Sequence, residues 1–249
     1  MGMEQHDTAA SDLSRRVQEI DWYHRIELPG GVVTPGVNNS SFSLSRLNLP
    51  NSLAGKSVLD VGAWDGFYSF EAAKRGADRV LATDSFVWQG RWKQNGFLLA
   101  RDALGLQTVV EDRFIDVMDL SPEALGGAFD VVLFLGVLYH LRDPVTALQR
   151  VSSVCKDLLV LETESALNFV PFPAARLWPG SELKHDDTNW WSFNRTALVA
   201  LLKSNGFKRV RIVYQTPLLR RVGRGLKSGR TFWKSFRGSR IVIHARRQE

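Results

Sequence analysis

The chain has 249 residues, of which 44% are hydrophobic and 23% are charged, values ordinary for a globular protein with room for one large α/β domain and a modest addition. The single cysteine, Cys155, excludes a disulfide within the chain and fits a reducing, cytoplasmic location, with a buried structural thiol as the favoured role. We find no signal peptide and no apolar run long enough to span a membrane, so we expect no membrane partner.

The first 50 residues predict a helix followed by an aromatic arm. Residues 1–10 are polar and without periodicity, so we expect them to be irregular, and apolar side chains at helical spacing predict a helix over 11–20. A turn-rich stretch follows that contains Trp22, Tyr23 and His24. Such bulky side chains need something to pack on, so the arm either covers the core from outside or forms a lid over an acceptor pocket.

Residues 58–66 form the central motif, D-V-G-A-W-D-G after an apolar strand. The pattern predicts a buried parallel strand, a glycine turn and a helix start, which is where open α/β sheets bind ligands. Trp64 stands where a dinucleotide fingerprint needs its middle glycine, and no P-loop Gly-Lys-Ser/Thr follows. A carboxylate at Asp60 would repel a pyrophosphate and attract an ammonium or sulfonium group. The alternative is that Asp60 caps the turn and that Gly62 and Gly66 only allow tight packing.

Two further strands end in carboxylates. Asp84, followed by Ser85, closes the strand over 80–84 and lies roughly 20 residues beyond the glycine turn, a position suited to ribose hydroxyls. Asp116 and Val117 end the third strand and suit the amino group and face of an adenine ring. Between these strands we expect one helix over 86–104.

A fourth strand, over 129–135, leads into the sharpest chemical signal outside the glycine turn. It ends at Leu135 and Gly136, and Tyr139 and His140 follow at the carboxyl end of the strand. A histidine there is either structural or a proton acceptor for a substrate. A fifth strand, over 158–163, carries Glu162 near its end.

The remainder predicts an irregular insertion and an antiparallel edge. Residues 164–192, with three tryptophans, are irregular, and insertions of this length are usually functional or mobile. A helix over 194–205 precedes two candidate last strands, over 207–213 and 239–245. We therefore predict an α/β fold with a doubly wound, mostly parallel, Rossmann-like sheet and an antiparallel last strand.

The net charge of +6 is unevenly placed, because a C-terminal stretch carries ten basic residues and no acidic one. These are Arg220, Arg221, Arg224, Lys227, Arg230, Lys234, Arg237, Arg240, Arg246 and Arg247. Most lie in the connection over 217–238. They either neutralise the phosphates of a bound RNA or form a solvated face.

Taken together, D-V-G-x-x-x-G, A-T-D and F-D-V-V-L-F-L-G-V-L-Y-H-L-R-D-P resemble the class I S-adenosylmethionine-dependent methyltransferases. The segment over 136–144, with L-V-L-E-T and a later Gly206-Phe207, is similar to the tRNA wobble-uridine (5-oxyacetic acid or 5-methoxyuridine) methyltransferase family and its shorter relatives. The resemblance covers roughly residues 55–215. The lysine-rich N-terminal stretch of those tRNA enzymes has no counterpart in this chain.

The resemblance implies S-adenosyl-L-methionine as the cofactor and a methyltransferase domain over 51–249, preceded by the arm over 1–50. The implied cofactor-binding residues are Asp60, Gly62, Ala63, Trp64, Gly66, Asp84, Ser85, Asp116, Val117, Leu135 and Gly136.

We favour a small metabolite, methylated on oxygen or nitrogen, as the acceptor. The alternative is a tRNA wobble uridine, with the basic C-terminal region holding the RNA. Catalytic candidates are His140, His24 and Tyr139, substrate-binding candidates are Trp22, Tyr23, Glu162 and Trp190, and no spacing indicates a metal site.

Overall fold

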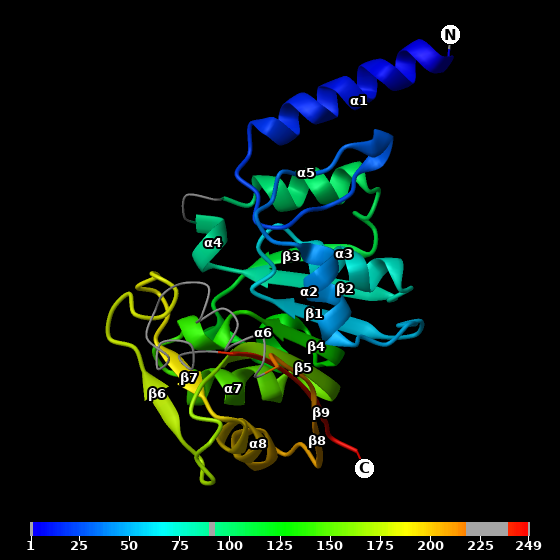
Figure 1. The fold of residues 1–249 in the computed structure, drawn as a ribbon. Helices are drawn as coiled ribbons and strands as arrows, with labels where there is room; N and C mark the ends of the chain where they lie inside the picture. The colour runs from blue at the N-terminus through cyan, green and yellow to red at the C-terminus, as the bar shows by residue number, and fades with distance from the viewer. Residues whose placement is uncertain (1, 90–92, 218–238, 249) are drawn as a thin grey trace. The chain divides into compact units, whose positions relative to one another are not determined.

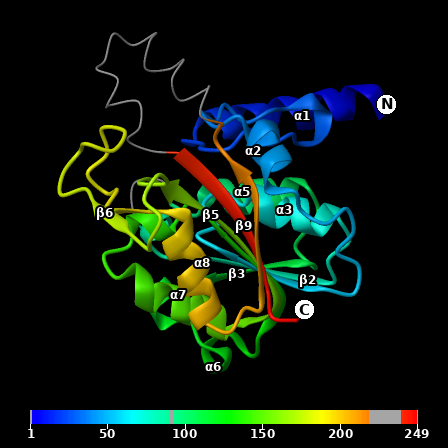
Figure 2. The ribbon, with the colours of Figure 1, turned by 60° about the horizontal axis from the view of Figure 1, so that its bottom comes forward.

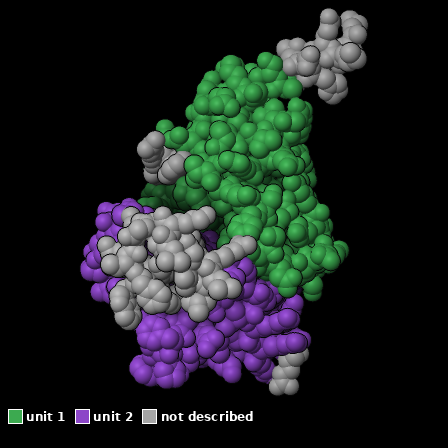
Figure 3. All heavy atoms as spheres, in the orientation of Figure 1, with its two compact units in different colours: residues 1–117 green, residues 118–249 purple. Residues whose placement is uncertain are grey.

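The computed structural model describes residues 2–89, 93–217 and 239–248. The chain divides into two compact units, residues 1–117 and residues 118–249, coloured separately in Figure 3. The predicted boundary at residue 50 stays a prediction. Much of the basic connection, 218–238, and Trp92 lie outside the described residues. In the described part of the chain, no helix has the length and apolar character needed to cross a membrane.

Unit 1 is built on three parallel strands in the order β3-β2-β1 (Figure 1). They are β1 (Ser57–Val61), β2 (Arg79–Asp84) and β3 (Val110–Phe114). Strands β1 and β2 are buried almost throughout because their residues are apolar on both faces, as a covered parallel sheet requires. Helix α3 (Phe67–Lys74) packs on β1 and β2 and begins directly after the glycine turn.

The helices of unit 1 differ from the prediction at two places. Helix α1 (Gly2–Gln18) begins earlier than expected, because residues 2–10 include good helix formers such as alanine, glutamate and glutamine. The helix expected over 86–104 is two helices, α4 (Phe86–Gln89) and α5 (Asn95–Ala103). Lys93 has a left-handed backbone, with φ of 53°, which a continuous α-helix does not allow. The arm adds η1 (Pro29–Gly31) and α2 (Ser40–Leu47).

Unit 2 contains the parallel pair β4 (Phe129–Leu135) and β5 (Cys155–Ser165), with α7 (Pro144–Ser153) packed on β5. Strand β9 (Ser239–Arg246) lies antiparallel between β5 and β8 (Arg209–Gln215), which confirms the antiparallel last strand (Figure 2). Helix α8 (Arg195–Ser204) confirms the helix predicted over 194–205 and is capped by the Asn194 side chain.

Shorter elements complete unit 2 and its boundary with unit 1 at Val117. They are η2 (Val117–Asp119), α6 (Pro122–Leu125) and η3 (Leu138–His140), and, in the segment expected to be irregular, β6 (Ala175–Leu177) and β7 (Trp191–Phe193). The insertion therefore ends in a small antiparallel pair, and β7 joins β5 where Ser165 lies beside Phe193. Trp178 is buried against Ala166 and Leu183, so this tryptophan is the core of the insertion.

Candidate functional site

The glycine turn of unit 1 is fastened to the neighbouring strand. The N–H groups of Gly62 and Ala63 both donate to the carbonyl of Thr83 on β2, at 2.8 and 3.0 Å. Gly66 has φ of +86°, and a Cβ there would lie 2.5 Å from Phe70 Cζ and 2.6 Å from Phe97 Cδ2. Packing and backbone conformation therefore both require glycine at position 66.

Asp60 places a buried carboxylate at the end of β1. Its Oδ2 accepts a hydrogen bond from the Ser69 hydroxyl at 2.6 Å. Burial raises the pKa of Asp60 to about 6, the Ser69 bond and nearby His24 lower it, and Asp84 raises it. Because burial disfavours the charged form of Asp60, a cation that binds beside it stabilises the carboxylate. An ammonium group is such a cation.

Asp84 organises the same turn from the end of β2. One carboxylate oxygen accepts the Trp64 N–H at 3.1 Å, and the other accepts the Val87 N–H at 3.0 Å. Burial raises the pKa of Asp84, and the backbone N–H bonds oppose that shift. The Asp84 carboxylate thus lies at the end of β2 beside the glycine turn, the position at which an acidic residue suits ribose hydroxyls.

A polar pair lies beside the end of β3. The Ser85 hydroxyl donates to Asp116 Oδ2 at 3.0 Å, and Val117 begins η2 immediately after Asp116. Unit 1 thus brings together nine of the predicted cofactor-binding residues, while Leu135 and Gly136 lie in unit 2 at the end of β4. This set of residues fits S-adenosylmethionine. Asp60 suits its ammonium group, Asp84 suits its ribose hydroxyls, and the glycine turn allows close approach to the backbone.

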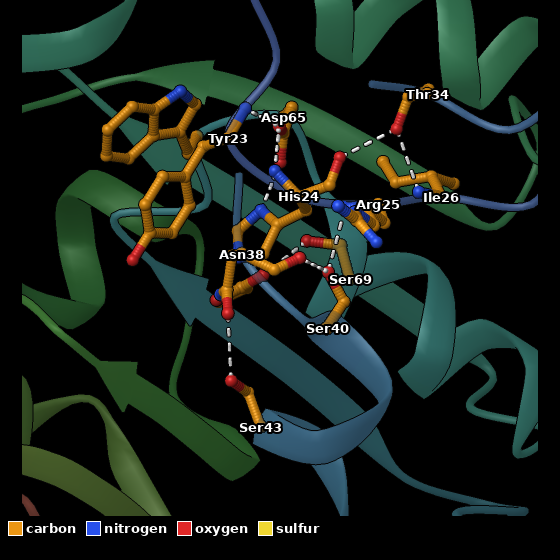
Figure 4. Close-up of polar contacts among 12 residues, drawn as sticks. Tyr23, His24, Arg25, Ile26, Thr34, Asn38, Ser40, Ser43, Asp65 and Ser69 are labelled. Atoms are coloured by element: carbon orange, nitrogen blue, oxygen red, sulfur yellow. Dashed lines mark hydrogen bonds and ion pairs between the residues drawn. The ribbon is translucent and has the colours of Figure 1, made fainter. Parts of the chain in front are cut away.

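The aromatic arm is fastened to the glycine turn by Asp65, which the sequence analysis did not single out (Figure 4). Asp65 Oδ2 accepts the N–H groups of Tyr23 and His24 at 2.9 and 2.8 Å, and its Oδ1 pairs with His24 Nδ1. The Tyr23 ring stacks on Trp64 at 4.3 Å. An aspartate that precedes a glycine is typical of a turn, so the sequence did not indicate that Asp65 binds the arm.

The arm also holds itself in shape. The Thr34 hydroxyl donates to the His24 carbonyl at 2.7 Å and accepts the Ile26 N–H at 2.8 Å. A Cβ at Gly36 would lie 2.2 Å from the His24 carbonyl atoms, so only glycine fits. Trp22 is buried, and its indole N–H donates to the Val17 carbonyl at 2.9 Å. This placement of Trp22 favours packing over substrate contact.

In unit 2, Tyr139 and Glu162 meet on Arg240, a residue that the sequence placed only in the basic run. Arg240 Nη1 donates to Glu162 Oε2 at 2.7 Å, Nη2 donates to the Tyr139 hydroxyl at 2.9 Å, and Nε lies 2.9 Å from Glu164 Oε1. Lys184 also pairs with Glu164. Strand register explains the encounter, because Arg240 on β9 lies opposite Glu164 on β5. The sequence alone does not reveal this register, because the two paired residues are more than 70 positions apart in the chain.

His140, at the end of η3, is held by the insertion. Its Nδ1 lies 2.9 Å from the Thr188 hydroxyl and 3.1 Å from the Thr188 carbonyl. Burial lowers the pKa of His140, while Thr188 and Asp186 raise it and Arg240 and Lys184 lower it further. The Trp190 N–H donates to the Tyr139 carbonyl at 2.8 Å, and Arg142 lies over the Trp190 ring at 4.5 Å.

Comparison with known proteins identifies the family. A family model described as "Methyltransferase domain" matches residues 41–212. The chain belongs to this methyltransferase family. Its cofactor is S-adenosylmethionine, and the predicted Rossmann-like, mostly parallel fold with an antiparallel edge is confirmed.

Relatives of this methyltransferase include two tRNA U34 carboxymethyltransferases. The protein from Pseudomonas putida is 31% identical over 181 residues, 70% of this chain and 52% of that protein. The protein from Alteromonas mediterranea is 29% identical over 167 residues, 65% of this chain and 47% of that protein. The chain thus spans about half the length of these curated relatives. The N-terminal domain of EvdMO1, crystallised in the presence of SAH and D-fucose, has a TM-score of 0.70 at 19% identity and covers 96% of this chain and 97% of its own.

Proposed function

We propose that this methyltransferase transfers a methyl group from S-adenosylmethionine to an oxygen or nitrogen of a small polar, partly aromatic metabolite. The observation that carries the proposal is the group of Tyr139, His140, Glu162 and Arg240 at the carboxyl ends of β4 and β5. A few convergent polar groups among aromatic rings are typical of a small-molecule site. The carboxyl ends of strands are also where open α/β sheets bind ligands.

Unit 1 supplies the residues that would hold the cofactor. Asp60 would meet the ammonium, Asp84 would accept from the ribose hydroxyls, and Asp116 with Val117 would recognise adenine. When bound, the cofactor supplies an electrophilic methyl group on a sulfonium. The chain's own contribution is to align the acceptor and, where the acceptor atom carries a proton, to remove it.

His140 is the residue that we assign to proton removal. A partly buried imidazole with a lowered pKa is neutral at neutral pH and can therefore accept a proton. Tyr139 is less suited to that role, since its hydroxyl accepts a hydrogen bond from the Arg240 guanidinium. His24 is engaged at Nδ1 by Asp65, which favours an orienting role for this histidine in the arm.

The second candidate is methylation of a tRNA, which the names of the relatives favour. The described basic residues near the C-terminus give that reading little support. Arg246 pairs with Asp157 at 2.6 Å, Arg247 donates to the carbonyls of Cys155 and Asn205, and Arg240 pairs with two glutamates. Their charges are therefore used within the protein rather than offered to phosphates.

The test is turnover with labelled S-adenosylmethionine against two separate acceptor pools, total tRNA and a small-molecule cell extract, with products identified by mass spectrometry. We expect label in the small-molecule pool. Methylated wobble uridine in the tRNA pool, with no small-molecule product, would overturn the proposal. A cofactor-binding control, Asp84→Ala, assayed at a low concentration of S-adenosylmethionine, identifies label that does not depend on the proposed cofactor site.

A further inference from the structure

We propose that Thr188 and Asp186, both in the insertion, are positioning residues that hold the neutral His140 imidazole with its proton on Nδ1 and its lone pair on Nε2. The catalytic meaning of this arrangement rests on the proposed function, in which His140 removes a proton. The arrangement itself follows from counting protons along one chain of hydrogen bonds.

The chain of hydrogen bonds begins at Asp186. Its Oδ1 accepts both the Thr188 hydroxyl, at 2.7 Å, and the Thr188 N–H, at 2.9 Å. Burial raises the pKa of Asp186, but the bonds from Thr188, the nearby His140 and a bond from Asn189 together shift it downward, so Asp186 is a carboxylate that only accepts.

The direction of the next bond is then fixed. A threonine hydroxyl has one proton, and Thr188 gives that proton to Asp186. Its oxygen can therefore only accept from His140 Nδ1, 2.9 Å away, and the Thr188 carbonyl at 3.1 Å can also only accept. Nδ1 must carry the hydrogen, and in a neutral ring Nε2 then carries the lone pair.

Two further contacts keep the insertion in place beside His140. The Asn189 amide donates to the Leu183 carbonyl at 2.9 Å and stiffens the turn that contains Asp186 and Thr188. The Trp190 N–H donates to the Tyr139 carbonyl, one residue before His140. Thr188 is thus tied to the segment that carries the imidazole and is positioned to fix its orientation.

The charged groups around His140 agree with a neutral resting state. Asp186 favours the protonated ring, whereas burial, Arg240 and Lys184 disfavour it. The Tyr139 ring lies 4.2 Å from the imidazole, centroid to centroid. Among the residues that the structure describes, Nε2 of His140 has no hydrogen-bond partner, so its lone pair is not used by that part of the chain.

The first experiment reads the tautomer without any substrate. Long-range nitrogen–proton NMR spectra of protein labelled with 15N-histidine distinguish the two neutral tautomers, and the His140→Gln variant assigns the resonance among the five histidines. We expect wild-type His140 to carry its proton on Nδ1. Thr188→Val should raise the population of the other tautomer several-fold, and Thr188→Ser should restore the wild-type spectrum. A wild-type ring protonated on Nε2 overturns the inference.

The second experiment separates charge from orientation. Asp186→Asn keeps an oxygen that accepts from Thr188 but removes the negative charge, so the pKa of His140 should fall while the tautomer is kept. Asp187→Asn makes the same change one residue away and should move neither quantity. Equal effects of the two substitutions would show that Asp186 has no special role.

Kinetics distinguish a failure of this inference from a failure of the proposed function. The acid limb of kcat/KM should follow the NMR pKa of His140, and both should move to lower pH in Asp186→Asn. Thr188→Val should lower kcat by about tenfold or more, with Thr188→Ser retaining most of it. If the tautomer is as inferred but His140→Gln keeps full turnover, the proton-removal role fails and the positioning remains. If His140→Gln abolishes turnover but the tautomer is reversed, the positioning fails.

Discussion

At the residue scale, Asp60 makes the stability of unit 1 depend on pH. Its pKa is raised from 3.8 to about 6, so the native state holds this proton more tightly than the unfolded chain does. The stability gained from that proton is fully present below about pH 4 and is lost as the pH rises through about 6. The loss has an upper limit of roughly 3 kcal/mol, from 1.36 kcal/mol per pKa unit.

Asp60→Asn should therefore flatten the pH dependence of unfolding of the cofactor-free protein. We expect the free energy of unfolding to fall less between pH 5 and pH 7.5 in the variant than in wild type, measured by urea denaturation. The same variant should bind S-adenosylmethionine more weakly at pH 7.5, because it lacks the charge that we propose meets the ammonium group. An unchanged pH slope would show that Asp60 titrates normally, while unchanged affinity would remove it from the cofactor site.

Asp84 is the second residue with a separable role. Under the proposed cofactor assignment, Asp84→Ala removes charge-assisted hydrogen bonds to the ribose, each worth roughly 1.5–3 kcal/mol, and it also releases the N–H groups of Trp64 and Val87. Asp84→Asn keeps one of the two acceptor oxygens, so it releases only one of those N–H groups. We expect calorimetry to show at least a tenfold rise in Kd for both variants, with a larger loss of stability in the alanine variant. Undiminished affinity in both variants would contradict the assignment.

At the element scale, the arm and the glycine turn are joined by one side chain. Asp65 accepts two backbone N–H groups and the His24 ring, and all of these groups are buried or partly buried. Asp65→Ala leaves buried donors unpaired, at about 1–3 kcal/mol for each buried group. We expect faster amide hydrogen exchange at Tyr23 and His24 and a lower free energy of unfolding.

Asp78→Ala is a matched control for that experiment. Asp78 also accepts a backbone N–H, from Gly55 at 2.9 Å, but at an exposed turn where water can replace the carboxylate. This control should leave exchange in the arm unchanged. If Asp65→Ala behaves like Asp78→Ala, the arm is held by its aromatic packing and not by Asp65.

Elements were predictable where local pattern decides them. The strands that end in Val61, Asp84 and Leu135, and the helix capped by Asn194, follow from apolar runs, turn residues and caps. The division of 86–104 into two helices was not, because lysine is not a residue type that marks a left-handed position in a sequence. Arg240 and Thr188 were missed for a related reason, since their partners are set by pairing across long stretches of chain.

At the scale of the whole molecule, the choice between a metabolite and an RNA is a question about charge. The net charge is +6, and seven basic residues from Arg220 to Arg237 lie outside the described residues. If they bind phosphates during turnover, affinity should fall steeply with salt, with a slope in log–log form of roughly 0.7 to 0.9 per phosphate contact. A small neutral acceptor should show almost no such slope.

The decisive variant replaces those seven residues with glutamine. Under the proposed function, we expect kcat/KM for the small acceptor to change less than about twofold, both in this variant and between about 50 and 200 mM salt. Arg240→Gln is the contrasting substitution, because it removes the partner of Glu162, Glu164 and Tyr139 and should reduce turnover without altering the salt dependence. A steep salt slope on tRNA turnover that disappears in the seven-residue variant would show that the basic segment presents an RNA, and the acceptor would then be nucleic acid.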